Sequence, residues 1–189
     1  DQRDLHSFPT RRSSDLNIPP VFLAGVFIFV NALALKTEKF KGMHSTDRVS
    51  YGTVYFPIAF LILALFWWEK PITLILSMLI MTFSDTIAAV IGERTPQPRN
   101  FRIWDDIKSI EGCLGMFLSS FIIIYIGTDL FAWLFGAAFF KPLPILIGTS
   151  GFVAMIVTLS EAVSSKGSDN FSVPIMTALS YDIFLINYT

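Results

Sequence analysis

PITLILSMLIMTFSDTIAAVI, the stretch from Pro71 to Ile91, is an apolar run with a single charged side chain, the carboxylate of Asp85. About 20 helical residues cross the roughly 30 Å hydrocarbon core of a bilayer, so this stretch predicts a transmembrane helix. A charge near the middle of such a helix costs about 2.5 to 3.5 kcal/mol on insertion scales. The stretch therefore predicts both a helical membrane protein and polar surroundings that compensate Asp85.

The composition of the chain agrees with this prediction. Hydrophobic residues make up 53% of the sequence and the mean hydropathy is +0.59. Charged residues make up 15%, against about a quarter in soluble domains. Further runs of suitable length are residues 18–35, 53–68, 112–127, 143–163 and 173–188. We therefore expect an all-α, polytopic integral membrane protein with about six transmembrane helices.

A further apolar segment, LFAWLFGAAFF from Leu130 to Phe140, is too short to cross a bilayer by itself. We expect it to be an interfacial or re-entrant piece.

The first sixteen residues differ from the rest of the chain in composition. HSFPTRRSSDL, from His6 to Leu16, back-translates to the end of a common sequencing adapter. We expect residues 1–16 to be a translated adapter and not native sequence, so they are excluded from reasoning about the fold. The expected domain is a single, N-terminally truncated transmembrane catalytic domain over residues 17–189.

The charge balance and the cysteine count narrow the classes of site. The formal net charge is -1, which provides no basic surface for nucleic acid, so no nucleic-acid partner is expected. Cys113 is the only cysteine, and outside residues 1–16 His44 is the only histidine. A disulfide within the chain and a Cys/His metal site are therefore excluded. Any bound metal is expected to be a hard cation held by carboxylates.

Basic residues indicate which side of the membrane the loops occupy. The loops 36–52 and 93–111 each carry several lysines and arginines, which predicts that both are cytoplasmic. With six spans, the loop 164–172 lies on the same side. The charged clusters described next are therefore expected at one cytoplasmic face.

The first cluster is SDTIAAVIG, which contains Asp85. Asp85, Ala88, Ala89 and Gly92 follow at i, i+3, i+4 and i+7, so they share one face of a helix. Small residues beside a carboxylate permit the close approach of phosphates or of another helix. Ordinary small-residue helix packing around a structural aspartate is the alternative.

The second cluster is DDIKSIEGCLG, which immediately precedes an apolar run. Lys108 supplies a point charge suited to phosphate, Ser109 a hydroxyl, Glu111 a carboxylate and Gly112 a close backbone approach. A juxtamembrane anchor with solvated charges is the alternative.

The third cluster is EAVSSKGSDNFSVP, Glu161 to Pro174, which follows another apolar run. Lys166 and Gly167 predict a turn, Asp169 and Asn170 offer hard oxygen ligands, and the final proline is expected to open the next helix. A simple turn with a helix cap is the alternative. The three clusters together contain the carboxylates, lysines and glycines of a Mg²⁺-nucleotide site.

These clusters, together with RVSYGTVYFP (Arg48 to Pro57), resemble the successive motifs of the CTP-dependent polyprenol kinase family. That family includes dolichol kinases, phytol kinases and CTP-dependent diacylglycerol kinases, and is related in fold to the phosphatidate cytidylyltransferases. The resemblance implies CTP as phosphoryl donor, Mg²⁺ as cofactor and a lipid alcohol as acceptor, in contact with membrane lipids. Two departures are Pro96, where the family has a second glycine, and the lack of its upstream Arg-Lys and His motif.

Charge and placement in these motifs suggest roles for individual residues. Asp85 and Asp169 are expected to bind metal, with Glu161 as a less favoured ligand. Lys108 and Lys166 are expected to contact phosphate. Glu111 is a candidate base for the acceptor hydroxyl or a residue that orients Lys108, which makes the catalytic set Asp85, Lys108, Glu111, Glu161 and Asp169. The expected nucleotide contacts are Ala88, Gly92, Ser109, Gly112, Lys166, Gly167 and Asn170.

The expected function is transfer of the γ-phosphate of CTP to a polyprenol, dolichol, phytol or diacylglycerol. The nearest alternative is a cytidylyltransferase that makes a CDP-lipid, but its histidine-glycine-glycine and paired-aspartate signature is absent here. A more distant alternative is a transporter with Asp85 as an intramembrane ion site.

Overall fold

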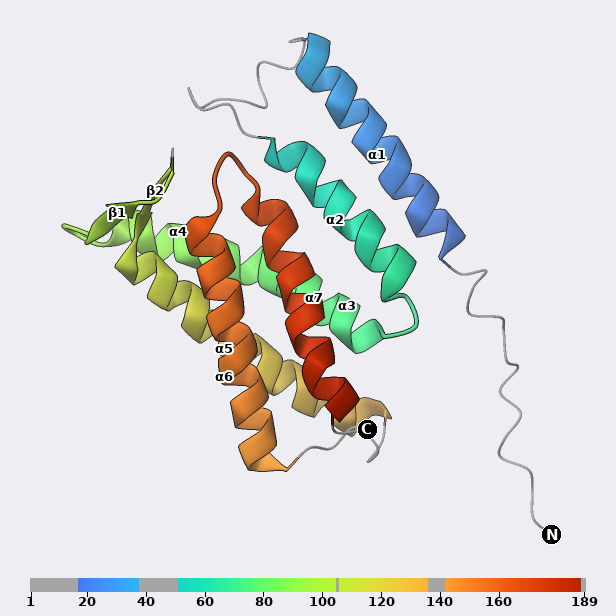
Figure 1. Ribbon diagram of the computed structural model, residues 1–189, viewed down its shortest axis with the longest axis vertical. Coiled ribbons are helices and arrows are strands. Elements are labelled where there is room, and N and C mark those ends of the chain that lie inside the picture. The colour runs from blue at the N-terminus through green and yellow to red at the C-terminus, as the bar shows by residue number, and fades with distance from the viewer. Residues whose placement is uncertain (1–16, 38–50, 105, 136–141, 188–189) are drawn as a thin grey trace.

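A computed structural model of the protein describes residues 17–37, 51–104, 106–135 and 142–187 (Figure 1). The prediction of a translated adapter at residues 1–16 lies outside these residues. His44 and residues 48–50 of the motif RVSYGTVYFP also lie outside them. Apart from one short hairpin, the regular structure of the described residues is helical, so the predicted all-α class is confirmed.

Seven α-helices follow one another along the described chain. Their bounds are α1 (Ile18–Thr37), α2 (Gly52–Phe66), α3 (Pro71–Leu79), α4 (Asp85–Arg94), α5 (Ile110–Phe135), α6 (Leu143–Val163) and α7 (Asp169–Asn187). A π-helical turn, η3 (Ile80–Ser84), joins α3 to α4, so these three elements form one continuous helical segment. That segment and three other helices, α1, α5 and α6, are long and apolar enough to cross a membrane.

The helix bounds correct two of the predicted segments. The run 112–127 is part of the 26-residue helix α5, which continues through Phe135. The prediction of a separate interfacial or re-entrant piece is therefore wrong for residues 130–135, while residues 136–140 lie outside the described chain. The run 53–68 forms α2, whose 15 residues span only about 22 Å at 1.5 Å per residue.

The start of α7 also differs from the prediction. Pro174 does not open the helix, because α7 begins at Asp169 and Pro174 lies inside it. Lys166 and Gly167 have positive φ values of 53° and 83°. The turn that contains them ends at Ser168, directly before the helix. The acidic Asp169 in the first turn is favoured at a helix N-terminus by the macrodipole. Asp169 and Asn170 are therefore helical residues and not part of a loop.

A two-stranded antiparallel hairpin lies between α4 and α5. Strands β1 (Asn100–Arg102) and β2 (Ile107–Ser109) pair with Phe101 opposite Lys108. The sequence predicts only a loop here, because three-residue strands are too short to show an alternating pattern. The hairpin holds Lys108 and Ser109 immediately before α5.

The core lies where α5, α6 and α7 pack around the segment from α3 to α4. Fully buried side chains from these elements form it: Ile80, Met116, Ile124, Val153, Val157 and Val173. Helix α1 packs on α2 at the edge of the molecule, away from α5 and α6 (Figure 1).

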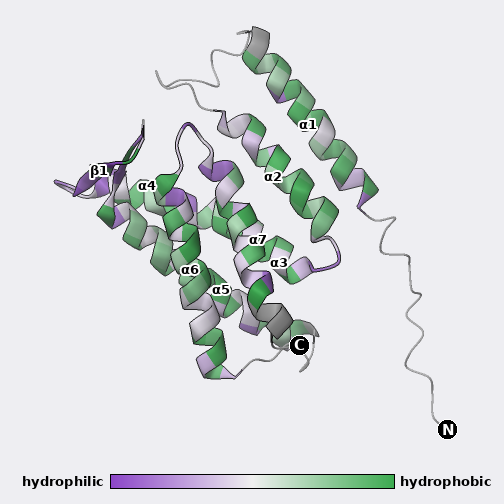
Figure 2. Cartoon of the chain, viewed as in Figure 1, coloured by the Kyte–Doolittle hydropathy of each residue, from purple (hydrophilic) through white to green (hydrophobic). Residues whose placement is uncertain are grey.

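Polar residues concentrate at the ends of the helices. Figure 2 shows hydrophilic residues at the hairpin and at the turn between α6 and α7, with apolar residues along the helices between the ends. At the opposite end of α7, Asp182 accepts hydrogen bonds from Trp67 Nε1 at 2.9 Å, Lys70 Nζ at 2.6 Å and Thr73 Oγ1 at 3.2 Å. This second polar cluster fixes the turn between α2 and α3 to α7.

Candidate functional site

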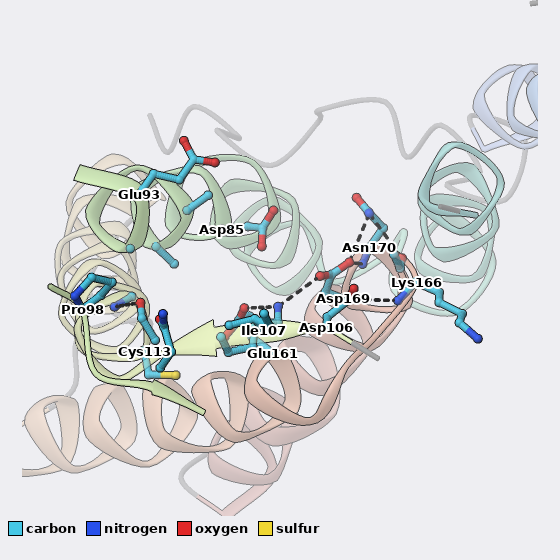
Figure 3. Close-up of a pocket in the computed structure, with 18 residues that line it drawn as sticks. Asp85, Glu93, Pro98, Asp106, Ile107, Cys113, Glu161, Lys166, Asp169 and Asn170 are labelled. Atoms are coloured by element: carbon cyan, nitrogen blue, oxygen red, sulfur yellow. Dashed lines mark hydrogen bonds and ion pairs between the residues drawn. The ribbon is translucent and has the colours of Figure 1, made fainter. Parts of the chain in front are cut away.

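A polar cavity of about 680 Å³ opens where α4, the hairpin and the turn between α6 and α7 meet. All three charged clusters of the sequence contribute to its walls (Figure 3). Of the twelve predicted site residues, the eleven that line the cavity are Asp85, Ala88, Gly92, Lys108, Ser109, Gly112, Glu161, Lys166, Gly167, Asp169 and Asn170. The fold therefore brings into one cavity residues that are separated by up to 85 positions in the chain, as Asp85 and Asn170 are.

Lys108 lies at the centre of the charged groups. Its Nζ forms an ion pair and a short hydrogen bond with Glu161 Oε1, and lies 3.5 Å from Asp169 Oδ2. The side chains of these three residues are 19%, 7% and 18% exposed, so the ion pairs are largely desolvated. Burial would lower the pKa of Lys108, but Glu161 and Asp169 raise it above its ordinary value. Lys108 is therefore a fixed positive charge at neutral pH.

Asp85 enters the cavity from the first turn of α4. The preceding π-helical turn brings the backbone N–H of Asp85 to the carbonyl of Ile80, five residues back. Among the described residues nothing donates a hydrogen bond to the Asp85 carboxylate, although it interacts electrostatically with Asp169, Glu161 and Lys108. Three carboxylates thus share one lysine, which leaves an excess of negative charge when all four groups are ionised. A divalent cation would neutralise this excess.

The small residues of α4 and α5 pack closely against one another. A Cβ added to Gly112 would lie 3.0 Å from the backbone oxygen of Ala88, and one added to Gly92 would lie 2.8 Å from Ser109 Oγ. Ser109 Oγ accepts a hydrogen bond from the N–H of Gly112, as an N-cap residue does. The alternative interpretation of these residues, small-residue packing, therefore applies at least in part, although they also face the cavity.

The turn between α6 and α7 contains Lys166, which was expected to contact phosphate. Figure 3 shows the Lys166 side chain directed away from Asp85, Glu161 and Asp169. Its backbone N–H donates to Asp106 Oδ2 at 2.7 Å, which joins the turn to the hairpin. Asp106 also lines the cavity, and the sequence analysis did not select it. Its place as the second aspartate of the charged DDIK stretch was the available signal.

Glu111, the candidate base or orienter of Lys108, is the one predicted site residue that does not line the cavity. Its carboxylate accepts hydrogen bonds from the backbone N–H and from Nε of Arg99, both at 3.0 Å. The hairpin brings Arg99 next to the start of α5, where Ile110 N–H also donates to Arg99 O. Glu111 therefore holds the hairpin to α5, and Glu161 is the residue that orients Lys108.

The described residues contain no group of three or more Asp, Glu, His or Cys side chains arranged to hold a metal ion. Mg²⁺ in nucleotide sites is commonly held by one or two carboxylates together with substrate phosphates and water. Asp85 and Asp169 provide two carboxylates of this kind in one cavity. The donor set therefore fits a magnesium ion that arrives with a nucleotide better than a permanently bound metal.

Comparison with known proteins identifies two relatives. No family model matches the chain, and no solved structure matches it. A protein named phytol kinase from Synechocystis sp. is 30% identical over 164 residues, which cover 86% of this chain and 65% of that protein. A probable chloroplastic phytol kinase from Triticum aestivum is 31% identical over 177 residues, which cover 84% of this chain and 56% of that protein.

The chain thus spans somewhat less than two thirds of the length of these curated relatives. The matches extend over most of the chain, and so over most of the helices that build the cavity. Over most of its length the chain is therefore similar in sequence to proteins named phytol kinase.

Proposed function

We propose that the protein is a membrane-embedded kinase that transfers the γ-phosphate of CTP to the hydroxyl of a prenyl alcohol. The observation that carries the proposal is the arrangement of Lys108, Asp85 and Asp169 in one polar cavity at the end of apolar helices. The names of the two relatives support a kinase that acts on phytol or a similar lipid alcohol. We also propose that the loops around the cavity are cytoplasmic.

Phosphoryl transfer requires positioning and charge neutralisation more than covalent chemistry. Lys108 is a fixed cation within the cavity, and we assign it to the transferred phosphate. Glu161 is a positioning residue, because it holds the Lys108 ammonium through an ion pair. Asp85 and Asp169 would hold Mg²⁺, which would neutralise charge on the phosphates when it is bound.

Labelled CTP tests the proposal directly. Membranes that contain the full-length protein would be incubated with Mg²⁺, a prenyl alcohol and CTP labelled at either the γ or the α phosphorus. Label in the extracted lipid from the γ position alone is the expected result. Label from the α position would make the protein a CDP-lipid synthase. Label from neither position, in a sample that is folded, would contradict both reactions and direct attention to a transport assay.

Asp85→Asn is the variant that tests the metal assignment. Removing the carboxylate while keeping its shape should lower γ-phosphate transfer by about 100-fold or more, as loss of an essential electrostatic group does. The matched control is Asp182→Asn, because Asp182 is also a carboxylate on a helix but lies in the polar cluster at the other end of α7. Asp182→Asn should retain transfer activity in the folded fraction. Equal activity of wild type and Asp85→Asn would contradict the assignment.

A further inference from the structure

A second cavity, of about 570 Å³, lies between α1 and α2 and is lined mainly by apolar residues. Leu23, Ala24 and Phe27 line it from α1, and Phe56 and Phe60 line it from α2. The described lining residues of α1 extend from Leu23 to Asn31, about 12 Å at 1.5 Å per residue. Its size and apolar walls suit part of a hydrocarbon chain.

One end of this apolar cavity is polar. Because α1 and α2 run in opposite directions (Figure 1), Asn31 of α1 lies at the same end as Gly52 and Thr53 of α2. Asn170, from the first turn of α7, also lines this cavity, and it is the one described residue that lines both cavities. The apolar cavity therefore ends at the wall of the polar one.

Two prolines leave backbone acceptors at this polar end. Pro57 has no N–H, so the carbonyl of Thr53 lacks its i+4 hydrogen bond, and Pro174 has the same effect on the carbonyl of Asn170. Thr53 and Asn170 both line the apolar cavity. These carbonyl oxygens are acceptors that could take a hydrogen bond from a hydroxyl group bound at this end.

The polar end is also fixed to the turn that carries the charged site. The backbone N–H of Tyr51, which precedes α2, donates to the carbonyl of Lys166 at 3.0 Å. Figure 3 shows Asn170 on the side of the charged cluster that faces α2. A ligand with an apolar tail and a terminal hydroxyl would therefore present that hydroxyl next to Asp169.

We propose that the cavity between α1 and α2 binds the hydrocarbon chain of the lipid alcohol, with its hydroxyl at Asn170. This proposal rests on the proposed kinase function, because that function supplies the class of ligand. This apolar cavity, called the groove below, would let an acceptor enter from the bilayer. Its hydroxyl would then reach the polar cavity while its hydrocarbon chain stays between α1 and α2. Ala24, which is 4% exposed, forms the floor of the groove on α1.

Photocrosslinking tests the position of the chain without requiring catalysis. The full-length protein in membranes would be irradiated with a prenyl alcohol that carries a diazirine on its tail, and the labelled residues mapped by mass spectrometry. We expect label on the groove-lining residues of α1 and α2, displaced by unlabelled alcohol. Label confined to α5 or α6 would overturn the proposal.

Two matched variants supply the second readout. Ala24→Phe should fill the groove, lower crosslinking and raise KM for the alcohol by about tenfold or more, with KM for CTP unchanged. Ala32→Phe makes the same change on an exposed position of α1 and should leave both values unchanged. If Ala24→Phe does not fold, Phe60→Ala replaces it, since removing a wall of the groove should also raise KM for the alcohol.

The two proposals can fail separately. Groove labelling in a wild-type protein that transfers no γ-phosphate would contradict the kinase and leave the groove as a lipid-alcohol site. Transfer of γ-phosphate with equal KM values in wild type, Ala24→Phe and Ala32→Phe would contradict the groove and leave the kinase.

Discussion

At the scale of single residues, the charged cavity is organised by Lys108. The Glu161 side chain is 7% exposed, so its carboxylate depends on the lysine for charge compensation. A buried ion pair contributes little net stability, but removal of one partner is costly because the other charge remains desolvated. The two residues are therefore coupled structurally, whereas only Lys108 is assigned to phosphate.

Lys108→Met separates these two roles. The single substitution should destabilise the protein by about 3 to 5 kcal/mol, since it leaves Glu161 buried without a partner. The double variant Lys108→Met/Glu161→Met should recover most of this stability and remain inactive. Thermal unfolding in detergent and γ-phosphate transfer would be measured for both. Recovery of activity in the double variant would remove Lys108 from the mechanism.

The sequence identified most of the site residues but not their orientations. Lys108 and Lys166 look similar in sequence, since each has a serine or glycine directly after it and an acidic residue three positions further along, Glu111 and Asp169. The hairpin directs Lys108 toward Glu161, whereas the positive φ of Lys166 belongs to a turn whose side chain points outward. The ion pair between Glu111 and Arg99 was not predictable either, because the pairing that brings Arg99 beside Glu111 depends on strand register.

At the scale of elements, the contact between α4 and α5 depends on glycine. Gly112 approaches the backbone of Ala88 so closely that a Cβ would lie 3.0 Å from its oxygen. Since the obstructing atom belongs to backbone, the helices must separate to admit a side chain. The same contact forms one wall of the polar cavity.

Gly112→Ala should therefore destabilise the protein by about 1 to 3 kcal/mol through overpacking. Gly148→Ala is the matched control, because a Cβ on Gly148 of α6 meets nothing within 4 Å. That substitution should be neutral or stabilise the protein by up to about 1 kcal/mol, since alanine restricts the unfolded chain. Equal unfolding midpoints for the two variants would contradict the close approach of α4 and α5.

The π-helical turn η3 is a second feature of the elements that the sequence did not predict. Apolar periodicity cannot distinguish it from regular α-helix over five residues. It accommodates an extra residue directly before Asp85, so the faces of α3 and α4 are offset from those of one regular helix.

Deletion of Phe83 should convert this turn to regular α-helix and leave both flanking helices facing their present neighbours. Deletion of Ile75 in α3 should instead rotate the rest of the helix by about 100° and expose the core side of the segment. Phe83 and Ile75 are similarly exposed, at 54% and 48%, so the loss of side-chain contacts is matched. The yield of monodisperse protein in detergent should remain high only for the Phe83 deletion. Equal loss in both would argue against a bulge-like turn.

At the scale of the whole molecule, polar groups occupy both ends of the bundle and apolar faces surround its middle. Helical class and most spans were predictable because hydropathy alone decides which segments suit a bilayer. The junction of the two cavities was not predictable, because it depends on how α2 and α7 lie against each other. The polar cluster at Asp182 was not predictable for the same reason. Its hydrogen-bond donors Trp67, Lys70 and Thr73 are more than 100 residues away from Asp182 in the sequence.

Cys113 provides a test of the proposed orientation, because it is the only cysteine in this sequence and it lines the polar cavity. An impermeant maleimide should label it when the cytoplasmic face of membrane vesicles is exposed and not when the opposite face is exposed. Mg²⁺ and CTP should slow the labelling. Glu69→Cys in a Cys113→Ser background should show the opposite sidedness. Labelling of Cys113 from the outer face would reverse the orientation.

The position of Asn170 on the wall of both cavities has a kinetic consequence. If the polar cavity binds the nucleotide and the apolar cavity binds the alcohol, as proposed, both substrates would be bound together, so transfer would proceed in a single ternary complex without a phosphorylated form of the protein. When the groove is empty, water becomes the nearest nucleophile to the bound nucleotide. Occupancy of the apolar groove would then set the ratio of phosphate transfer to nucleotide hydrolysis. Contacts with the hydrocarbon chain would thus decide how much nucleotide is hydrolysed without forming product.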